Sequence, residues 1–350
     1  MKRSFLSVFL SVLSVCAASA HDFMVVQNGQ KIYFNILDSK AKTAEVTYGG
    51  SITDNDSPKP QGRVEIPASV QYNQTVYKVT SIGKKAFANA TELTSIVLPG
   101  GITTIDDFAF ENCTQLTSVI MPGTQVTFGQ GTFFRCTEIG HVTWGSDWTV
   151  IDLAVFRWAN KIQEITIPAK VNKIYNINSL KGLKSVTVDN NNSQYSSNDG
   201  LIYTKDGSVL LACPLAYEGS LKVADTATII KAGAMIGCTG ITSVDLPEKM
   251  GKISFREFSK MSRLESITFR NPSPIITAKC NNGEVFVLQV ANPDVKVTVP
   301  KAGLNDYKNA LVQTEGEYLA NSPKAQTPYL VKANEMINKK NLKGVKLITP

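Results

Sequence analysis

The sequence is poor in charge and has no basic cluster. Charged residues make up 19% of its 350 residues, below the roughly 25% of an average protein. Hydrophobic residues reach 43%, which is too many for a disordered chain. The 36 Lys and Arg and 29 Asp and Glu are scattered, whereas nucleic-acid-binding proteins gather basic residues on one face. We therefore expect a folded protein that does not bind nucleic acid.

Cysteine and histidine are too sparse for a metal centre, and no catalytic motif accompanies them. The chain lacks a C-x-x-C pair, the clustered arrangement that metal sites use. His141 is the only histidine after His21. A nucleophilic Ser118 beside it would also need an orienting carboxylate and an oxyanion motif, and neither is evident. We expect no cofactor, no metal and no enzymatic activity.

Only one long hydrophobic run is present, and it lies at the N-terminus. Two basic residues precede an apolar stretch at 5–15 and a small-residue site at 18–20, the pattern of a secretory signal peptide. The run is shorter than the roughly 20 residues that span a bilayer. We expect cleavage after Ala20 and export, with a secreted, periplasmic or outer-surface location. Lipid attachment at Cys16 is the alternative.

A motif recurs along the chain every 23 residues. One copy runs from Ile82 through Phe87 and Ile96 to Pro99. Further copies place their aromatic or Met residue at Phe110, Phe133, Phe156, Met235 and Phe258. Such a period predicts a solenoid, in which each repeat stacks on the next.

Each copy also predicts its own strand and core. Ile96 and Leu98 alternate with polar neighbours and point inward, and Pro99 ends the strand because proline donates no hydrogen bond. Stacked copies bury one column at the Phe87 position and a second at Leu98, Met121, Trp144, Ile167, Val188, Leu246 and Phe269. Burying one such side chain contributes roughly 1.5–3 kcal/mol.

Five cysteines remain after the signal peptide, and three of them share one repeat position. These are Cys113, Cys136 and Cys238, which predicts a small buried side chain at one turn of each coil. An odd number leaves at least one thiol unpaired. A disulfide between Cys113 and Cys136 on adjacent coils stays open.

The repeats divide the chain into segments. We expect a β-rich N-terminal cap at 21–63 and a solenoid with its C-terminal cap at 64–314. A β-hairpin is inserted at about 190–228, where Asp206 and Gly207 form a turn signal between two strands. The tail at 315–350 has no clear pattern.

The repeat frame I-x-x-x-A-F-x-x-C-x-x-L-x-x-I-x-L-P resembles the BspA-like leucine-rich repeat family of bacterial surface proteins. The resemblance covers about 64–300 and is closest at 105–119. It implies a β-rich leucine-rich repeat solenoid, all-β or leaning to α+β. The resemblance further implies export and adhesion to host or matrix proteins, a step that rests on analogy.

The outward strand positions are the predicted contact surface. We expect Ile120, His141, Thr143 and Glu164 to lie side by side on consecutive strands, because parallel strands repeat about every 4.8 Å. Trp158 aligns with turn positions and is the best candidate for an exposed aromatic anchor. A protein is the expected partner of this patch. A glycan is the second candidate.

Overall fold

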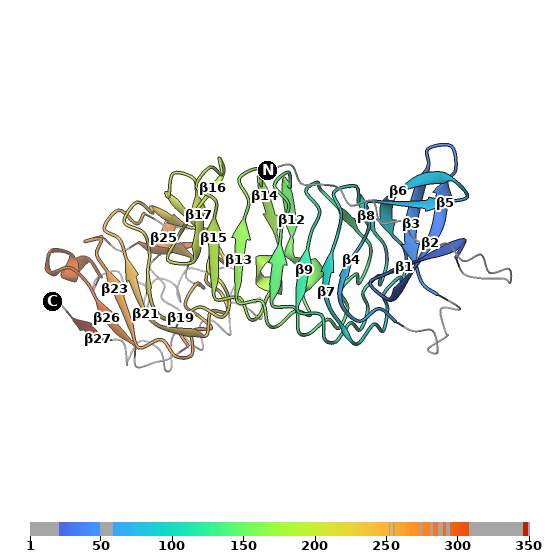
Figure 1. Cartoon of the computed structure of the whole chain (residues 1–350). Helices are drawn as coiled ribbons and strands as arrows, with labels where there is room; N and C mark the ends of the chain where they lie inside the picture. The colour runs from blue at the N-terminus through green and yellow to red at the C-terminus, as the bar shows by residue number, and fades with distance from the viewer. Residues whose placement is uncertain are drawn as a thin grey trace, which may run out of the picture. The chain divides into compact units, whose positions relative to one another are not determined.

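The computed structural model describes residues 21–49, 59–251, 253–254, 256–273, 275–280, 283–285, 290–291, 295–307 and 346–348. Its residues fall into two compact units, Met1–Ile162 with Lys170–Leu180, and Gln163–Ala169 with Lys181–Pro350. Figure 1 labels the strands of both units. Both units are built from repeat coils, as the 23-residue period predicts. The signal peptide and Cys16 lie outside the described residues, and the predicted segment boundaries stay predictions.

The first unit carries a ladder of parallel strands, one from each coil. It runs β11 (His141–Thr143), β9 (Ser118–Ile120), β7 (Leu93–Val97), β4 (Gly62–Glu65). Ser95 pairs with Ser118, which in turn pairs with His141. The alternate residues Ile96 and Val119 are fully buried, so the predicted inward and outward positions are confirmed.

A second ladder follows the first along each coil. It contains β6 (Thr75–Ile82), β8 (Thr104–Ile105) and β10 (Thr127–Phe128), while β12 (Val150–Asp152) pairs instead with β14 (Lys173–Tyr175). The cap strands β1 (Phe23–Gln27), β2 (Gln30–Asp38) and β3 (Thr43–Thr47) extend this ladder, and β5 (Ser69–Tyr72) pairs with β6. Asn28 and Gly29 turn between β1 and β2 with φ of 50° and 76°, as a tight hairpin requires.

The return segments at 83–90, 106–113, 129–136 and 152–159 close the coils and supply the aromatic column. Phe87, Phe110, Phe133 and Phe156 stack with ring centroids 5.1, 5.2 and 4.9 Å apart. All four are at most 1% exposed. In the second unit Met235 and Phe258 are also fully buried, which confirms the predicted column within each unit.

The repeated cysteines are buried thiols. Cys113 donates to the carbonyl oxygen of Phe87 at 3.2 Å, and Cys136 to that of Phe110 at 2.9 Å. The neighbouring Cys136 thiol and burial raise the pKa of Cys113. Among the described residues Cys113, Cys136, Cys213 and Cys238 are all unpaired thiols, so the two adjacent cysteines form no disulfide.

Gly145 replaces the repeat proline for a steric reason. A Cβ at this position would collide with the carbonyl oxygen of Pro122 on the preceding coil. The indole of Trp148 donates to the same oxygen at 3.0 Å. Trp144 and Trp148 are 9% and 1% exposed, so both belong to the core, as predicted.

The second unit repeats the two-ladder plan. Its ladders contain β13 (Glu164–Ile167) with β15 (Ser185–Val188), and β19 (Glu218–Lys222), β21 (Gly240–Leu246), β23 (Ser266–Phe269), β26 (Lys296–Thr298) and β27 (Lys346–Ile348) in order. Further strands of this unit are β20 (Ile229–Ile230), β22 (Ile253–Ser254), β24 (Ile276–Cys280) and β25 (Gly283–Val285). The pairing of β27 with β26 was not predicted from the sequence.

The predicted hairpin is present and gains one strand. β17 (Leu201–Thr204) and β18 (Val209–Ala212) are antiparallel, and Gly207 in their turn has φ of 72°. β16 (Tyr195–Asn198) also pairs with β17. Because β18 continues in parallel to β20, the hairpin is part of the ladder rather than an appendage.

Helical structure in the described part of the chain is limited to short turns. The described residues include the 3-10 helices η1 (Leu153–Phe156), η2 (Ile177–Ser179) and η3 (Lys301–Gly303). A helical turn at 304–307 follows η3. Within the part of the chain that is described, no helix has the length and apolar character to cross a membrane.

Truncating Phe110 to alanine tests the aromatic column. We expect a loss of about 3–5 kcal/mol in the free energy of unfolding, because the ring leaves a cavity between two stacked neighbours. Urea denaturation measures the loss. The exposed Gln115→Ala on the same coil should stay within about 0.5 kcal/mol of the parent, and an equally small loss for Phe110→Ala would show that the column is not core.

Candidate functional site

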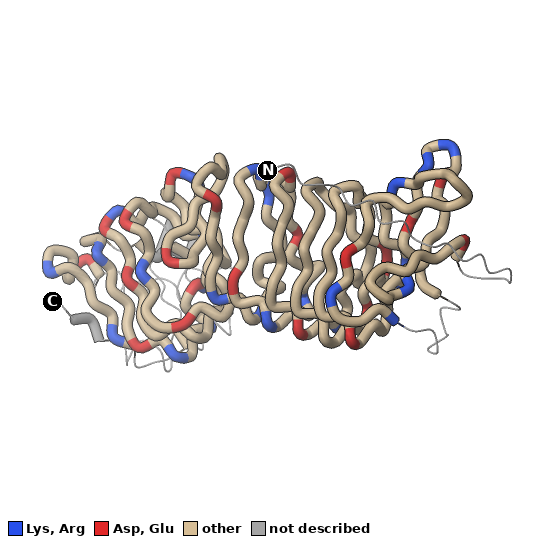
Figure 2. The backbone as a smooth tube through the Cα atoms, viewed as in Figure 1, with Lys and Arg blue, Asp and Glu red and all other residues tan. Residues whose placement is uncertain are grey.

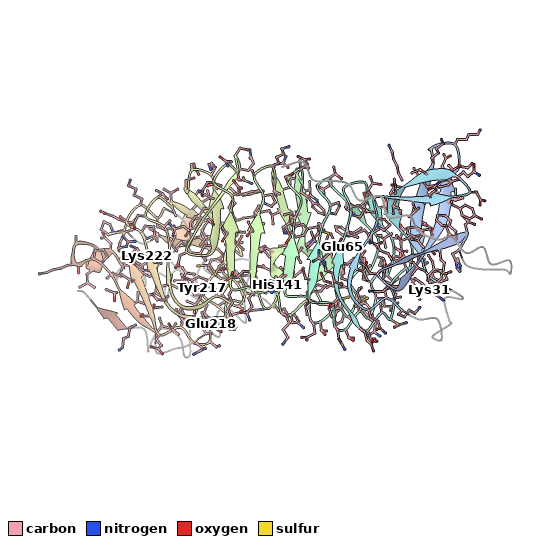
Figure 3. The ribbon with its side chains drawn as sticks, viewed as in Figure 1. Lys31, Glu65, His141, Tyr217, Glu218 and Lys222 are labelled. Atoms are coloured by element: carbon pink, nitrogen blue, oxygen red, sulfur yellow. The ribbon has the colours of Figure 1, made fainter. Side chains whose placement is uncertain are left out.

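The structure brings three of the five predicted contact residues together. Ile120 on β9 is the register partner of Thr143 on β11, and His141 precedes Thr143 by two positions on the same outward side. His141 and Thr143 are exposed and Ile120 is half-buried. We call the outward side chains of β7, β9 and β11 the strand face (Figure 3 labels His141).

The other two predicted residues belong to other elements. Glu164 is on β13 in the second unit and pairs with Ser185. Trp158 follows η1 on a return segment and is therefore not on the strand face. Trp158 is 38% exposed, as expected of an aromatic anchor. The strand face of the first unit thus contains Ile120, His141 and Thr143 of the five predicted residues.

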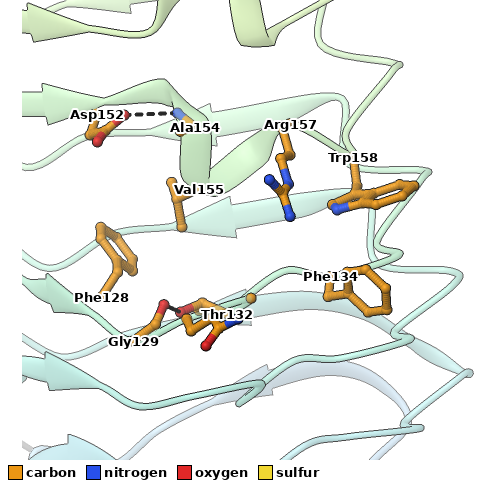
Figure 4. Close-up of a pocket in the computed structure, with 11 residues that line it drawn as sticks. Phe128, Gly129, Thr132, Phe134, Asp152, Ala154, Val155, Arg157 and Trp158 are labelled. Carbon is orange, nitrogen blue, oxygen red and sulfur yellow. Dashed lines mark hydrogen bonds between the residues drawn. The ribbon is translucent and has the colours of Figure 1, made fainter.

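Trp158 borders a groove that the sequence did not predict. The groove has a volume of about 460 Å³ and lies between the return segments that contain Phe133 and Phe156. We call it the return groove (Figure 4). Its lining residues are Phe128, Gly129, Gln130, Gly131, Thr132, Phe134, Asp152, Ala154, Val155, Arg157 and Trp158.

The groove opens because hydrogen bonding between coils stops at this point. On the preceding coil the N–H groups of Phe108, Phe110 and Asn112 donate to the carbonyls of the next coil at 2.8–2.9 Å. The equivalent N–H groups, 23 residues on, belong to Gly131, Phe133 and Arg135. Among the described residues none accepts a hydrogen bond from these three amides.

The return segment of the Phe156 coil differs in backbone conformation. Phe108 and Gly131 have φ of 56° and 61°, the left-handed region that most side chains avoid. The equivalent Ala154 does not adopt it and belongs to η1. Asp152 accepts from the Ala154 N–H at 2.9 Å, and the backbone N–H of Arg157 donates to the Ala154 carbonyl at 3.2 Å. The 3-10 helix therefore bonds within itself rather than to the preceding coil.

A side chain replaces the backbone ladder beside the groove. β10 and β12 are not paired, and Gln125 lies between their coils. Its Oε1 accepts from the N–H groups of Thr149 and Val150 at 3.2 and 3.1 Å, and its Nε2 donates to the Val150 carbonyl at 3.0 Å. The inserted amide spaces the two coils along this side.

One end of the groove is aromatic and cationic. Trp158 meets Phe134 edge to face at 5.1 Å and 81°. The guanidinium of Arg157 lies 5.9 Å from the Trp158 ring, and that of Arg135 lies 5.2 Å from Phe134, which are cation–π distances. Figure 4 places Asp152 toward the opposite end.

The second unit contains a comparable pair of amides with a carboxylate on them. Gly233 and Met235 align in the repeat with Gly131 and Phe133. The two oxygens of the buried Glu257 accept from the N–H of Gly233 at 2.6 Å and from that of Met235 at 2.9 Å. Burial raises the pKa of Glu257, although these two donors oppose the shift.

No metal-binding arrangement is evident. In the described part of the chain no group of three or more His, Cys, Asp and Glu side chains is placed to hold a metal ion. The strand face and the return groove are the two candidate sites, and both lie in the first unit. Their polar groups can bind and orient a ligand.

Hydrogen exchange tests whether the return groove interrupts the ladder. We expect the amides of Gly131 and Phe133 to exchange at least about tenfold faster than those of Phe108 and Phe110, because they lack a protein acceptor. Residue-resolved exchange measured by NMR compares the four amides in one sample. Equal protection would mean that the coils are hydrogen-bonded here.

The stability conferred by Glu257 should depend on pH. Its folded pKa is raised, so its contribution to the free energy of unfolding is fully present below the unfolded pKa of about 4.3 and is lost as pH rises through the folded pKa. Urea denaturation of the parent and of Glu257→Gln from pH 4 to 8 measures this. The parent should lose stability relative to the variant as pH rises, and a constant difference would contradict the prediction.

Comparison with known proteins places the chain among bacterial repeat proteins. Residues 69–198 and 218–284 match, in six copies, the family described as BspA type Leucine rich repeat region. No curated protein sequence matches the chain.

Several solved structures are similar. The pneumococcal vaccine antigen PcpA is similar over 82% of this chain and 96% of its own, with 16% identity and a TM-score of 0.46. A leucine rich cell surface protein from Faecalibacterium prausnitzii is similar over 80% and 89%, with 19% identity and a TM-score of 0.39. A leucine-rich repeat protein from Eubacterium ventriosum is similar over 85% and 82%, with 15% identity and a TM-score of 0.42. Because the family model matches more than half of its residues, the chain belongs to the BspA-type leucine-rich repeat family.

Proposed function

We propose that this protein is an exported, non-catalytic binding module of the bacterial cell surface, with a protein as its partner. Proteins of its family are cell-surface proteins, and leucine-rich repeats generally mediate protein binding. The observation that carries the proposal is the neutral strand face. β7, β9 and β11 contain no charged residue, and Figure 2 shows none along β7 and β9.

A neutral face of this kind suits protein docking. The cores of protein interfaces are depleted in charged residues, because each buried ion must first lose its water. Ile120 and Val97 offer apolar contacts, and Ser118 and Thr143 offer hydroxyl groups beside them. The nearest charges on this ladder, Arg63 and Glu65 on β4, bond to each other at 2.6 Å.

The same surface lacks the parts of a hydrolase. His141 is beside Ser118 in register, the one juxtaposition that suggests a nucleophile and a base. Among the described residues no carboxylate hydrogen-bonds to His141, and a catalytic histidine needs such a group to orient it. This supports a binding role over hydrolysis.

Export rests on the N-terminal pattern, and the secreted protein tests it. We expect a mature chain that begins at His21, because small residues precede it at the cleavage site. Edman sequencing or mass spectrometry of the protein released by its native host identifies the first residue. An acylated Cys16 would make the protein a lipoprotein instead.

Substitutions on the strand face test the binding surface. A partner is first identified on an array of host-matrix proteins, beside an array of polysaccharides. Ile120→Asp and His141→Asp should each weaken binding at least tenfold, or about 1.4 kcal/mol, because each places a charge that must be desolvated. Calorimetry measures the affinity, and the melting temperature should not change.

Thr166→Asp, at an exposed strand position of the second unit, is the matched control and should bind as the parent does. Unchanged affinity in both strand-face variants would move the contact surface elsewhere. Binding to polysaccharides alone would favour the glycan alternative.

A further inference from the structure

We propose that the return groove binds a carboxylate of an acidic peptide segment, through the amides of Gly131 and Phe133 and the guanidinium of Arg157. The inference rests on the proposed protein-binding function but concerns a different site. It identifies the chemistry that the groove recognises in a protein partner.

The first observation is the direction of the amides. In the two preceding coils the N–H groups at this repeat position point along the stack at the next return segment and donate to its carbonyls. By the same register the N–H groups of Gly131 and Phe133 point toward the segment that contains Val155. The groove lies between these segments, and Gly131 and Val155 both line it.

The second observation is that, in the second unit, the chain itself places a carboxylate on the equivalent pair of amides, those of Gly233 and Met235. Glu257 is 24 residues after Gly233 and 22 after Met235. In the first unit, Val155 is likewise 24 residues after Gly131 and 22 residues after Phe133 in the sequence. Where the second unit has a glutamate that binds both amides, the first unit has a short apolar side chain and an open groove.

The third observation is a cation at the mouth of the groove. Arg157 lines the groove, and none of the described carboxylates forms an ion pair or hydrogen bond with its guanidinium. Two backbone donors and a guanidinium make a strong carboxylate site, because charge-assisted hydrogen bonds are about twice as strong as neutral ones. Asp152, at the other end in Figure 4, would keep the bound carboxylate near Arg157.

The remaining lining favours a peptide over an acidic sugar. At the equivalent positions of the described coils, the acceptors are peptide carbonyls, the carboxylates of Glu257 and Asp152, and the hydroxyl of Ser254. Val155, Ala154 and Phe134 present apolar surface next to the donors. That surface fits the side chain of a residue that neighbours the carboxylate, and Trp158 closes the end.

Peptide arrays provide the first test. The probe is a set of immobilised hexapeptides, each with one central glutamate in varied surroundings, beside the same set with glutamine. We expect the parent protein to bind the best glutamate peptides at least tenfold more tightly than their glutamine counterparts. Equal binding to the two sets would overturn the proposal, and so would binding only to uronate oligosaccharides.

Substitution of Val155 tests the geometry without removing any groove donor. Val155→Glu should place an internal carboxylate on Gly131 and Phe133, as Glu257 does in the second unit, and lower peptide affinity at least tenfold. Val155→Gln, of equal size and without charge, should lower it less. If Val155→Glu binds glutamate peptides as tightly as the parent does, these amides are not the site.

Two variants that each remove one positive charge distinguish binding in the groove from general electrostatic attraction. Arg157→Gln should lose at least tenfold in affinity for glutamate peptides, whereas Arg63→Gln, which removes the same charge from β4, should match the parent. Equal losses would mean that net charge alone attracts the peptides, and would overturn the proposal. Melting temperatures confirm that each variant is folded.

Hydrogen exchange on the parent gives a readout that needs no variant. The best glutamate peptide should slow exchange of the Gly131 and Phe133 amides at least tenfold and leave Phe108 and Phe110 unchanged. No added protection would place the peptide elsewhere.

The outcomes also distinguish this proposal from the proposed function. If the glutamate peptides do not bind while Ile120→Asp still weakens binding to a protein partner, the groove assignment is wrong and the proposed function stands. If the peptides bind in the groove but no protein partner is found, the groove assignment stands and the proposed function is wrong.

Discussion

Each coil of this protein leaves a row of backbone N–H groups that only the next coil can satisfy. Phe87 donates to Ala109, and Phe110 donates to Thr132, so the stack depends on a repeat that places a carbonyl at the right height every 23 residues. Leaving a buried donor without an acceptor costs about 1–3 kcal/mol. The apolar columns supply much of the stability, but it is this pairing that fixes the spacing and register of the coils.

The chain responds in three ways where a coil cannot offer its carbonyls. Gln125 inserts a side-chain amide between two coils, and this amide both accepts and donates the hydrogen bonds that a neighbouring strand would otherwise form. Glu257 accepts two hydrogen bonds from the preceding coil with one carboxylate, although burial disfavours the ionised form of that group. At Gly131 and Phe133 no described side chain accepts these bonds, and Gly131 lines a groove.

The period of the sequence was sufficient to predict the repeated parts of the fold. Ile96 and Phe110 are buried where the frame puts them, Cys113 is a small buried side chain, and Asp206 and Gly207 turn a hairpin. The return groove was not predictable in the same way. It depends on the sign of φ at Ala154 and on a glutamine that hydrogen-bonds across two coils, and neither feature produces a periodic pattern in the sequence. Of the groove, only Trp158 could be identified, because an aromatic residue at a turn position breaks the pattern.

The exceptions to the repeat are therefore more informative about function than the repeat itself. A regular coil directs its donors into the next coil and presents short neutral side chains on the strand face, a surface that can be wide but has little chemical preference. An irregular coil exposes donors whose direction is already fixed by the stack, so binding a ligand there costs little ordering of the protein. Glu257 shows which acceptor such donors bind in this chain, namely a carboxylate. A solenoid of this kind can then gain a selective site by losing one side chain at one repeat position, while the columns on either side continue to hold the coils in place.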